Sequence, residues 1–189
     1  MSVGFGIRAE MGEKELSEIN RVLRQGGLPA YQNPEIDPTR AAHCSSCRAG
    51  IYTIFDGGHC LGRASLDHNG ASSFDQLARL AQEHLGAEAR VLPLLLLGQL
   101  VYFLPISFTD PLYSDHMYHP RQPLCSSQQT TSELVALATH LDIPLEGSLL
   151  SDATARAINN TPDEPQTVWL TMFEAARQSV AHKCALILG

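Results

Sequence analysis

The sequence lacks the short motifs that mark several large enzyme classes. It contains no Gly-x-x-x-x-Gly-Lys-Ser/Thr, no Gly-x-Gly-x-x-Gly after a predicted strand, no His-Glu-x-x-His and no Gly-x-Ser-x-Gly. Such motifs supply the phosphate cradle, the metal ligands or the activated serine that the corresponding reactions need. Their absence favours a non-enzymatic function, and we assign no residue a catalytic role.

A segment for export or for crossing a membrane is also missing. Residues 1–8 have no basic region followed by a continuous apolar run, as a secretory signal would. The most apolar stretch, residues 91–104, is interrupted by Pro93 and Gly98, and a spanning helix needs about 20 apolar residues. The five cysteines form no evident disulfide framework, which suits a reducing compartment. We therefore expect a bacterial, cytoplasmic protein that does not bind a membrane.

Basic side chains are scarce compared with acidic ones. The chain has 13 Lys and Arg against 20 Asp and Glu, a formal net charge of −7. Residues 96–189 hold nine acidic and four basic side chains, so the excess lies mainly in the C-terminal half. A field of this sign repels phosphate backbones and attracts cationic surfaces, which argues against nucleic-acid binding and favours a basic protein partner. A requirement for solubility alone would explain the same charge.

Hydrophobic periodicity predicts an α+β fold. Val3, Phe5 and Ile7 alternate with small or charged residues, as in a strand with one buried face, and residues 184–188 resemble a closing strand. Ser73 and Gln76 form the pattern of a capping box. Helices are predicted at residues 13–25, 73–85, 127–141, 151–159 and from about 161 to 182. We expect a single domain, residues 1–189, with a mixed, mostly antiparallel sheet, helices packed on it and a mainly helical C-terminal half.

Two apolar runs in the middle of the chain predict a buried β-hairpin. Residues 92–97 and 100–104 are separated by Gly98 and Gln99, which fits a type II′ turn with glycine first. Prolines and glycine argue against the competing interpretation, a buried helix. Asp56-Gly57-Gly58 predicts another hairpin earlier in the chain. Residues 105–125, with four prolines and no period, predict a long loop, and loops of that length are usually functional or mobile.

Cysteine and histidine residues between positions 43 and 60 give one candidate site. Cys44, Cys47, Cys60 and a histidine such as His59 could form a tetrahedral zinc site. However, there is no second Cys-x-x-Cys pair, and a domain of this size needs no metal to fold. The competing interpretation is a polar loop whose thiols are free or packed, and we assign no cofactor.

The loop at residues 105–125 gives a second candidate. Its carboxylates and imidazoles could bind a metal ion or act as general acid and base, although Pro111 and Pro120 argue against a helix that would align the histidines. A solvated loop is the competing interpretation. Its aromatic and sulfur-containing side chains suit protein recognition. The candidate partner-binding residues are therefore Asp110, Tyr113, Asp115, His116, Met117, Tyr118 and His119.

Two segments resemble small bacterial immunity-type proteins of polymorphic toxin systems. The first is Leu66-x-His68-x-Gly70-x-Ser72-x-Phe74 before a helix, and the second is the helix at residues 169–181 that leads into a terminal apolar strand. The resemblance implies an acidic domain that binds and blocks a toxin, and it transfers no functional residue. The favoured hypothesis is thus a non-enzymatic, acidic binding protein that inhibits a basic partner. The alternative is a metal-dependent or thiol enzyme that uses either candidate site.

Overall fold

The computed structural model describes residues 3–8, 11–34, 55–56, 59–60, 65–66, 70–97, 100–115, 117, 121–160 and 164–188. In chain order, its α-helices are α1 (Glu13–Gln25), α2 (Gly70–Leu85), α3 (Ser127–Ala138), α4 (Asp152–Asn160) and α5 (Glu164–His182). Three 3₁₀-helices are η1 (Gly86–Glu88), η2 (Leu92–Leu97) and η3 (Thr139–Leu141). The strands are β1 (Val3–Arg8), β2 (Phe55–Asp56), β3 (His59–Cys60), β4 (Ser65–Leu66), β5 (Val101–Leu104), β6 (Leu112–Ser114), β7 (Gln122–Ser126) and β8 (Ala185–Leu188).

The strands form a mixed sheet in which antiparallel pairs predominate. Six of them follow the order β4-β1-β8-β5-β7-β6, and β2 pairs with β3 in the separate hairpin that the Asp56-Gly57-Gly58 sequence predicts. Among the described strands, β5 and β7 are the one parallel pair. The last strand, β8, lies between β1 and β5, so residues from both ends of the chain meet inside the sheet. The predicted α+β fold with a mostly antiparallel sheet is confirmed.

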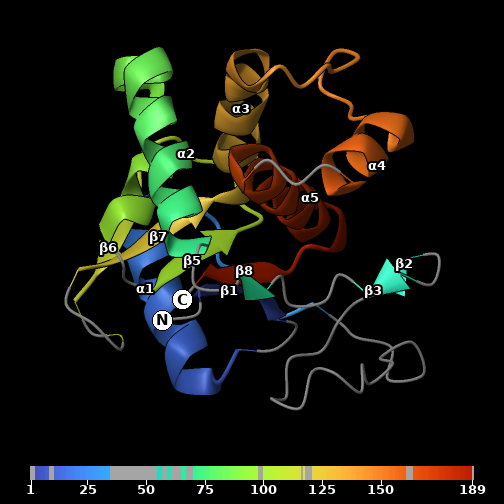
Figure 1. Ribbon diagram of the computed structural model, residues 1–189. Helices are drawn as coiled ribbons and strands as arrows, with labels where there is room; N and C mark the ends of the chain where they lie inside the picture. The colour runs from blue at the N-terminus through green and yellow to red at the C-terminus, as the bar shows by residue number, and fades with distance from the viewer. Residues whose placement is uncertain are drawn as a thin grey trace.

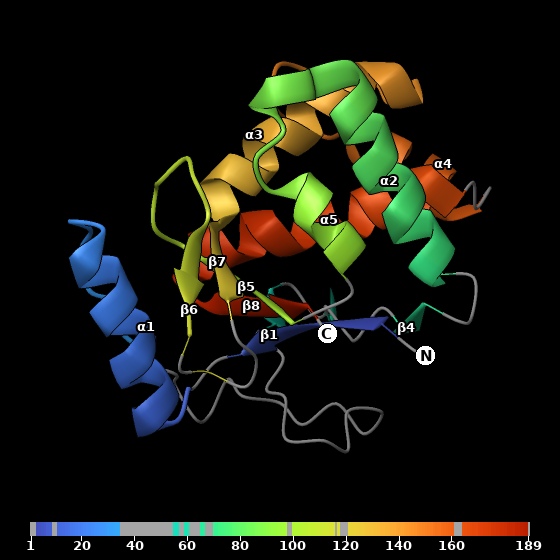
Figure 2. The ribbon, with the colours of Figure 1, turned by 90° about the vertical axis from the view of Figure 1, so that its left-hand side faces the viewer.

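Side chains that alternate along β5 divide the interior into two cores. Val101 and Phe103 pack with residues of α2, α3 and α5, whereas Tyr102 and Leu104 pack with residues of α1. This is the alternation expected of a strand that is buried on both faces. Figures 1 and 2 show the same division, with α2, α3, α4 and α5 on one side of the sheet and α1 on the other.

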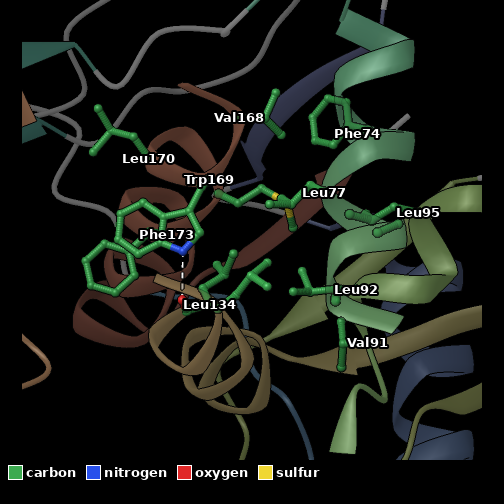
Figure 3. Close-up of a cluster of buried hydrophobic side chains, with 14 of the residues drawn as sticks. Phe74, Leu77, Val91, Leu92, Leu95, Leu134, Val168, Trp169, Leu170 and Phe173 are labelled. Atoms are coloured by element: carbon green, nitrogen blue, oxygen red, sulfur yellow. Dashed lines mark hydrogen bonds between the residues drawn. The ribbon is translucent and has the colours of Figure 1, made fainter. Parts of the chain in front are cut away.

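Trp169 of α5 joins the helices of the larger core. It is fully buried, and its ring stacks on Phe173 with 4.7 Å between ring centroids. Its indole N–H donates to the backbone carbonyl of Leu134 on α3 at 2.7 Å (Figure 3). A buried indole N–H needs an acceptor, so this hydrogen bond fixes α5 against α3.

Residues 92–97 form the 3₁₀-helix η2, so the predicted hairpin is wrong in its first arm. The reason is Glu133, a buried residue of α3 whose carboxylate accepts hydrogen bonds from the backbone N–H groups of Arg90, Val91 and Leu92 at 2.8–3.1 Å. The first N–H groups of a helix have no partner within it, and here a distant carboxylate supplies one. Local sequence cannot reveal a contact between residues 41 to 43 positions apart. The second arm forms β5, as predicted.

The segment predicted as a loop, residues 105–125, contains two strands. β6 pairs antiparallel with β7, and β7 runs parallel to β5, so β6 forms an edge of the sheet. The prediction of a continuous loop is therefore wrong. With three and five residues, these strands are too short for a period of two to stand out, and the prolines in the segment conceal them further.

Most predicted helices agree with the structure. α1 has the predicted bounds, α3 with η3 covers residues 127–141, and α4 and α5 match the remaining two, which confirms a mainly helical C-terminal half. α2 begins at Gly70, so the predicted start at Ser73 is wrong by three residues. Its end at Leu85 is as predicted, because Gly86 adopts a left-handed φ of 54° that favours glycine.

Candidate functional site

The predicted partner-binding residues do not form one charged surface where the structure describes them. Asp110 and Asp115 are exposed, and Asp110 forms an ion pair with Arg90 at 3.5 Å. Tyr113 is 41% exposed on β6. Met117 is partly buried and packs against the core beneath α1. The other three, His116, Tyr118 and His119, lie outside the described residues, so a role for the whole set stays a prediction.

Cations next to this region compensate its negative charge. Arg21 of α1 makes two hydrogen bonds of 2.8 Å to the Glu18 carboxylate, and Ser114 of β6 also donates to Glu18. The hydrogen bond to Glu18 raises the pKa of Arg21, and the charges of Glu18 and Asp115 act in the same direction. Arg121 lies over the ring of Tyr113, with 5.4 Å to the ring centroid. The α1 and β6 side of the molecule is therefore not strongly negative.

The candidate zinc ligands cannot be evaluated from the described residues. His59 and Cys60 form β3, where they pair with Asp56 and Phe55, but their side chains and the residues Cys44 and Cys47 lie outside the described part. Within the described part, no three His, Cys, Asp or Glu side chains form a group that could bind a metal ion. The zinc site stays a prediction.

The two thiols that the structure describes are not placed for nucleophilic chemistry. Cys125 and Cys184 are free and fully buried. Burial raises the pKa of Cys125 far above its usual value and that of Cys184 to about 11. Only the thiolate is a good nucleophile, and these two groups stay protonated at neutral pH. Cys184 belongs to the core, as its apolar surroundings in the sequence predict.

Negative charge gathers instead at one end of the molecule, where two separate segments meet. His84 in the last turn of α2 stacks on His140 of η3, with 4.1 Å between ring centroids and 13° between ring planes. Both views place the last turns of α2 and α3 at the same end, away from the sheet (Figures 1 and 2). The stacked rings place the last turn of α2 beside η3.

We call the exposed carboxylates of these two segments the acidic end. It consists of Glu83, Glu88, Asp142 and Glu146. Within the described part of the chain, ion pairs join Arg21 to Glu18, Arg90 to Asp110 and Arg177 to Glu174, and none includes a member of this set. The acidic end therefore carries four carboxylates that form no ion pair in the described part of a chain whose net charge is −7. Arg79 lies one helical turn before Glu83, and Arg90 follows Glu88 by two residues.

The helix ends add to the negative field at this site. The carbonyl groups of a helix C-terminus carry partial negative charge, and proteins commonly place Lys or Arg beside them. Here both α2 and η3 end with histidine as the basic residue of the last turn. Asp142 is the C-cap of η3, and Glu88 lies on η1, three residues after the end of α2. Glu146 lies beyond these helices, in a β-bridge with Leu149.

Sequence reasoning missed this site, although a signal for it exists. Residues 80–89 and 137–155 contain no lysine or arginine, and each segment holds at least two acidic residues. That the two segments are neighbours in space follows only from tertiary packing. A comparison of net charge between the two halves of the chain assigns one of these segments to each half. It therefore does not reveal that they contribute to one surface.

Comparisons with known proteins agree with the acidic character of the chain. None of the described helices has the length and hydropathy needed to span a membrane. Neither a curated protein nor a solved structure matches the sequence. A protein family does match, over residues 7–188, and it is described as "Putative DNA-mimic protein". Because this match covers nearly the whole sequence, the chain belongs to that DNA-mimic family, whose description fits an acidic protein that binds another protein.

Proposed function

We propose that this protein is a non-enzymatic DNA mimic that binds the DNA-binding face of a basic protein in the bacterial cytoplasm. The single observation that carries the proposal is the acidic end, four exposed carboxylates without a cationic partner beside two helix C-termini. Membership of the DNA-mimic family supports it.

The physical basis is competition for one cationic surface. A DNA-binding protein neutralises phosphates with Lys and Arg, and this electrostatic contact supplies most of its non-specific affinity. A rigid set of carboxylates offers the same basic side chains an alternative anion. Binding of the mimic should then exclude DNA, weaken steeply with added salt and involve no chemical reaction.

The immunity-type role that the sequence resemblance implies is one form of the same proposal. In that form, the partner would be a toxin whose cationic active surface normally contacts nucleic acid. The two forms differ in the identity of the partner and share the acidic end as the contact.

The experiment uses the full chain, immobilised and exposed to the heparin-binding proteins of the native host. We expect captured proteins to elute on addition of a short DNA duplex and to be lost at about 0.5 M salt, where the Debye length falls to a few ångströms. The chain alone should leave the electrophoretic mobility of the duplex unchanged. Captured proteins that neither duplex DNA nor salt releases would argue against DNA mimicry.

Two matched variants locate the contact. The acidic-end variant carries Glu83→Gln, Glu88→Gln, Asp142→Asn and Glu146→Gln, and asparagine tolerates the left-handed φ of 54° at position 142. The control variant removes the same charge elsewhere, with Glu13→Gln, Asp75→Asn, Asp110→Asn and Asp115→Asn. We expect binding to fall by at least about 10-fold in the first and less than about 3-fold in the second. Equal losses, or a larger loss in the control, would place the contact elsewhere.

A further inference from the structure

We propose that the stacked pair His84 and His140 imitates the exposed edges of stacked purine bases, and that an arginine of the DNA-binding partner reads it. This inference rests on the proposed function and names the chemistry of its contact. The two rings are exposed, nearly parallel and 4.1 Å apart between centroids. Successive base pairs in duplex DNA are stacked with a rise of about 3.4 Å.

The chemical likeness concerns the ring itself. The five-membered ring of a purine is an imidazole, and its N7 atom is an acceptor that arginine contacts in the major groove. A neutral histidine side chain offers the same ring with one acceptor nitrogen. Glu83 precedes His84 directly and Asp142 follows His140 by two residues, so the pair combines stacked nitrogen heterocycles with anions close in sequence.

Arginine suits this contact better than lysine. Its guanidinium is planar, weakly hydrated and able to stack on a ring while it donates hydrogen bonds to an acceptor or a carboxylate. Two contacts of this kind occur within the chain, where Arg121 lies over Tyr113 and Arg177 lies over Phe173. Lysine presents a point charge and gains little from the rings. The arginines nearest to His84 in the sequence are Arg79 and Arg90, and Arg90 already pairs with Asp110. We assign the guanidinium on the histidine pair to the partner.

The test compares nona-arginine with nona-lysine as probes of the full chain at low salt and about pH 7.5. We expect the wild-type chain to bind nona-arginine at least about 5-fold more tightly than nona-lysine. In a His84→Ala/His140→Ala variant this preference should fall below about 2-fold while nona-lysine affinity stays constant. A His84→Phe/His140→Phe variant keeps two aromatic rings without hydrogen-bond acceptors, so it separates the effect of ring stacking from that of hydrogen bonding. It also provides a second variant should the alanine variant fail to fold.

The outcomes separate this inference from the proposed function. An arginine preference that persists in the alanine variant, or is missing from the wild-type chain, would overturn the role of the histidine pair and leave the acidic end intact. Failure of both peptides to bind, or equal binding by the acidic-end variant, would overturn the proposed function as well.

Discussion

Glu133 is the residue on which the position of η2 depends. Replacing it with alanine removes the acceptor for three backbone N–H groups, of which those of Val91 and Leu92 are buried. Buried donors without a partner are costly, so we expect Glu133→Ala to lower the free energy of unfolding by about 3 kcal/mol. Urea denaturation measures the loss, with exposed Glu88→Ala as the control expected to change stability by less than about 0.5 kcal/mol. Similar values for both variants would contradict the capping role.

Tyr31 predicts how stability changes at alkaline pH. Its hydroxyl accepts a hydrogen bond from the Ala185 N–H at 3.0 Å, and burial raises its pKa to about 12. The unfolded chain ionises this phenol near its ordinary pKa of 10, while the folded chain keeps it neutral. Its contribution is therefore complete below pH 10 and is lost as the pH approaches 12, a decline of roughly 2 kcal/mol.

A Tyr31→Phe variant isolates this contribution from the other groups that titrate in the same range. The variant should be less stable than wild type by about 1 kcal/mol at pH 8, because it lacks the hydrogen-bond acceptor for Ala185. Between pH 10 and 12 the gap should close and then reverse, because the wild type loses more stability over this range than the variant lacks at pH 8, as measured by urea denaturation at several pH values. Parallel curves for the two proteins would show that Tyr31 ionises alike in both states.

Thiol reactivity tests whether Cys125 and Cys184 are core residues. A variant with serine at positions 44, 47 and 60 keeps these two thiols alone. We expect a disulfide reagent to modify them on the order of 100-fold more slowly in the native protein than in urea, because both are buried and protonated. Rapid labelling of the folded variant would instead indicate an accessible thiolate and revive the thiol-enzyme alternative.

Helix α1 begins with a cap that can be improved. Gly12 occupies the N-cap with an extended backbone, no side-chain hydrogen bond and open space around the position of a Cβ atom. Serine there can accept a bond from a first-turn N–H, so we expect Gly12→Ser to stabilise the protein by about 0.5 kcal/mol relative to Gly12→Ala. The alanine variant is the matched control for the entropy of the unfolded chain. Equal melting temperatures would show that α1 does not limit stability.

The elements that sequence predicted well are those whose signals are local. α1 was predicted to the residue because its buried side chains, Ile19, Val22 and Leu23, recur at helical spacing between acidic and basic ends. η2 was mistaken for a strand because a run of leucines suits either structure, and the deciding contact comes from Glu133 on another helix. β6 was missed because three residues between prolines carry too little pattern. Tertiary partners decided each error.

The candidate site shows the same limit across the molecule as a whole. Composition predicted an acidic protein-binding chain correctly, because net charge depends on no structure. The position of that charge was not predictable, since His84 and His140, which lie next to acidic residues in the sequence, meet only when the end of α2 packs against η3. Residues 105–125 were predicted to bind a partner because of their residue types. In the structure, cationic side chains lie next to the carboxylates of this segment. Packing thus determines where an acidic sequence presents its negative charge.

A surface kept for charge complementarity should reduce the stability of the free protein. The carboxylates of the acidic end add negative charge near the C-terminal carbonyls of α2 and η3, and none of them forms an ion pair in the described part of the chain. We therefore expect the acidic-end variant to be more stable than wild type by about 0.5–1 kcal/mol at low salt, with the difference shrinking as salt screens the repulsion.

The control variant should behave in the opposite way. It loses the Asp110 ion pair with Arg90 and the favourable Glu13 charge in the first turn of α1, so its stability should stay level or fall. Thermal unfolding of the three proteins across a salt series measures both effects. If the stability of the two variants changes by the same amount, the effect depends on total charge and not on the position of the acidic end. An increase in stability confined to the acidic-end variant would mean that this surface lowers the stability of the free protein. That is expected for a surface whose charges are balanced only by a partner.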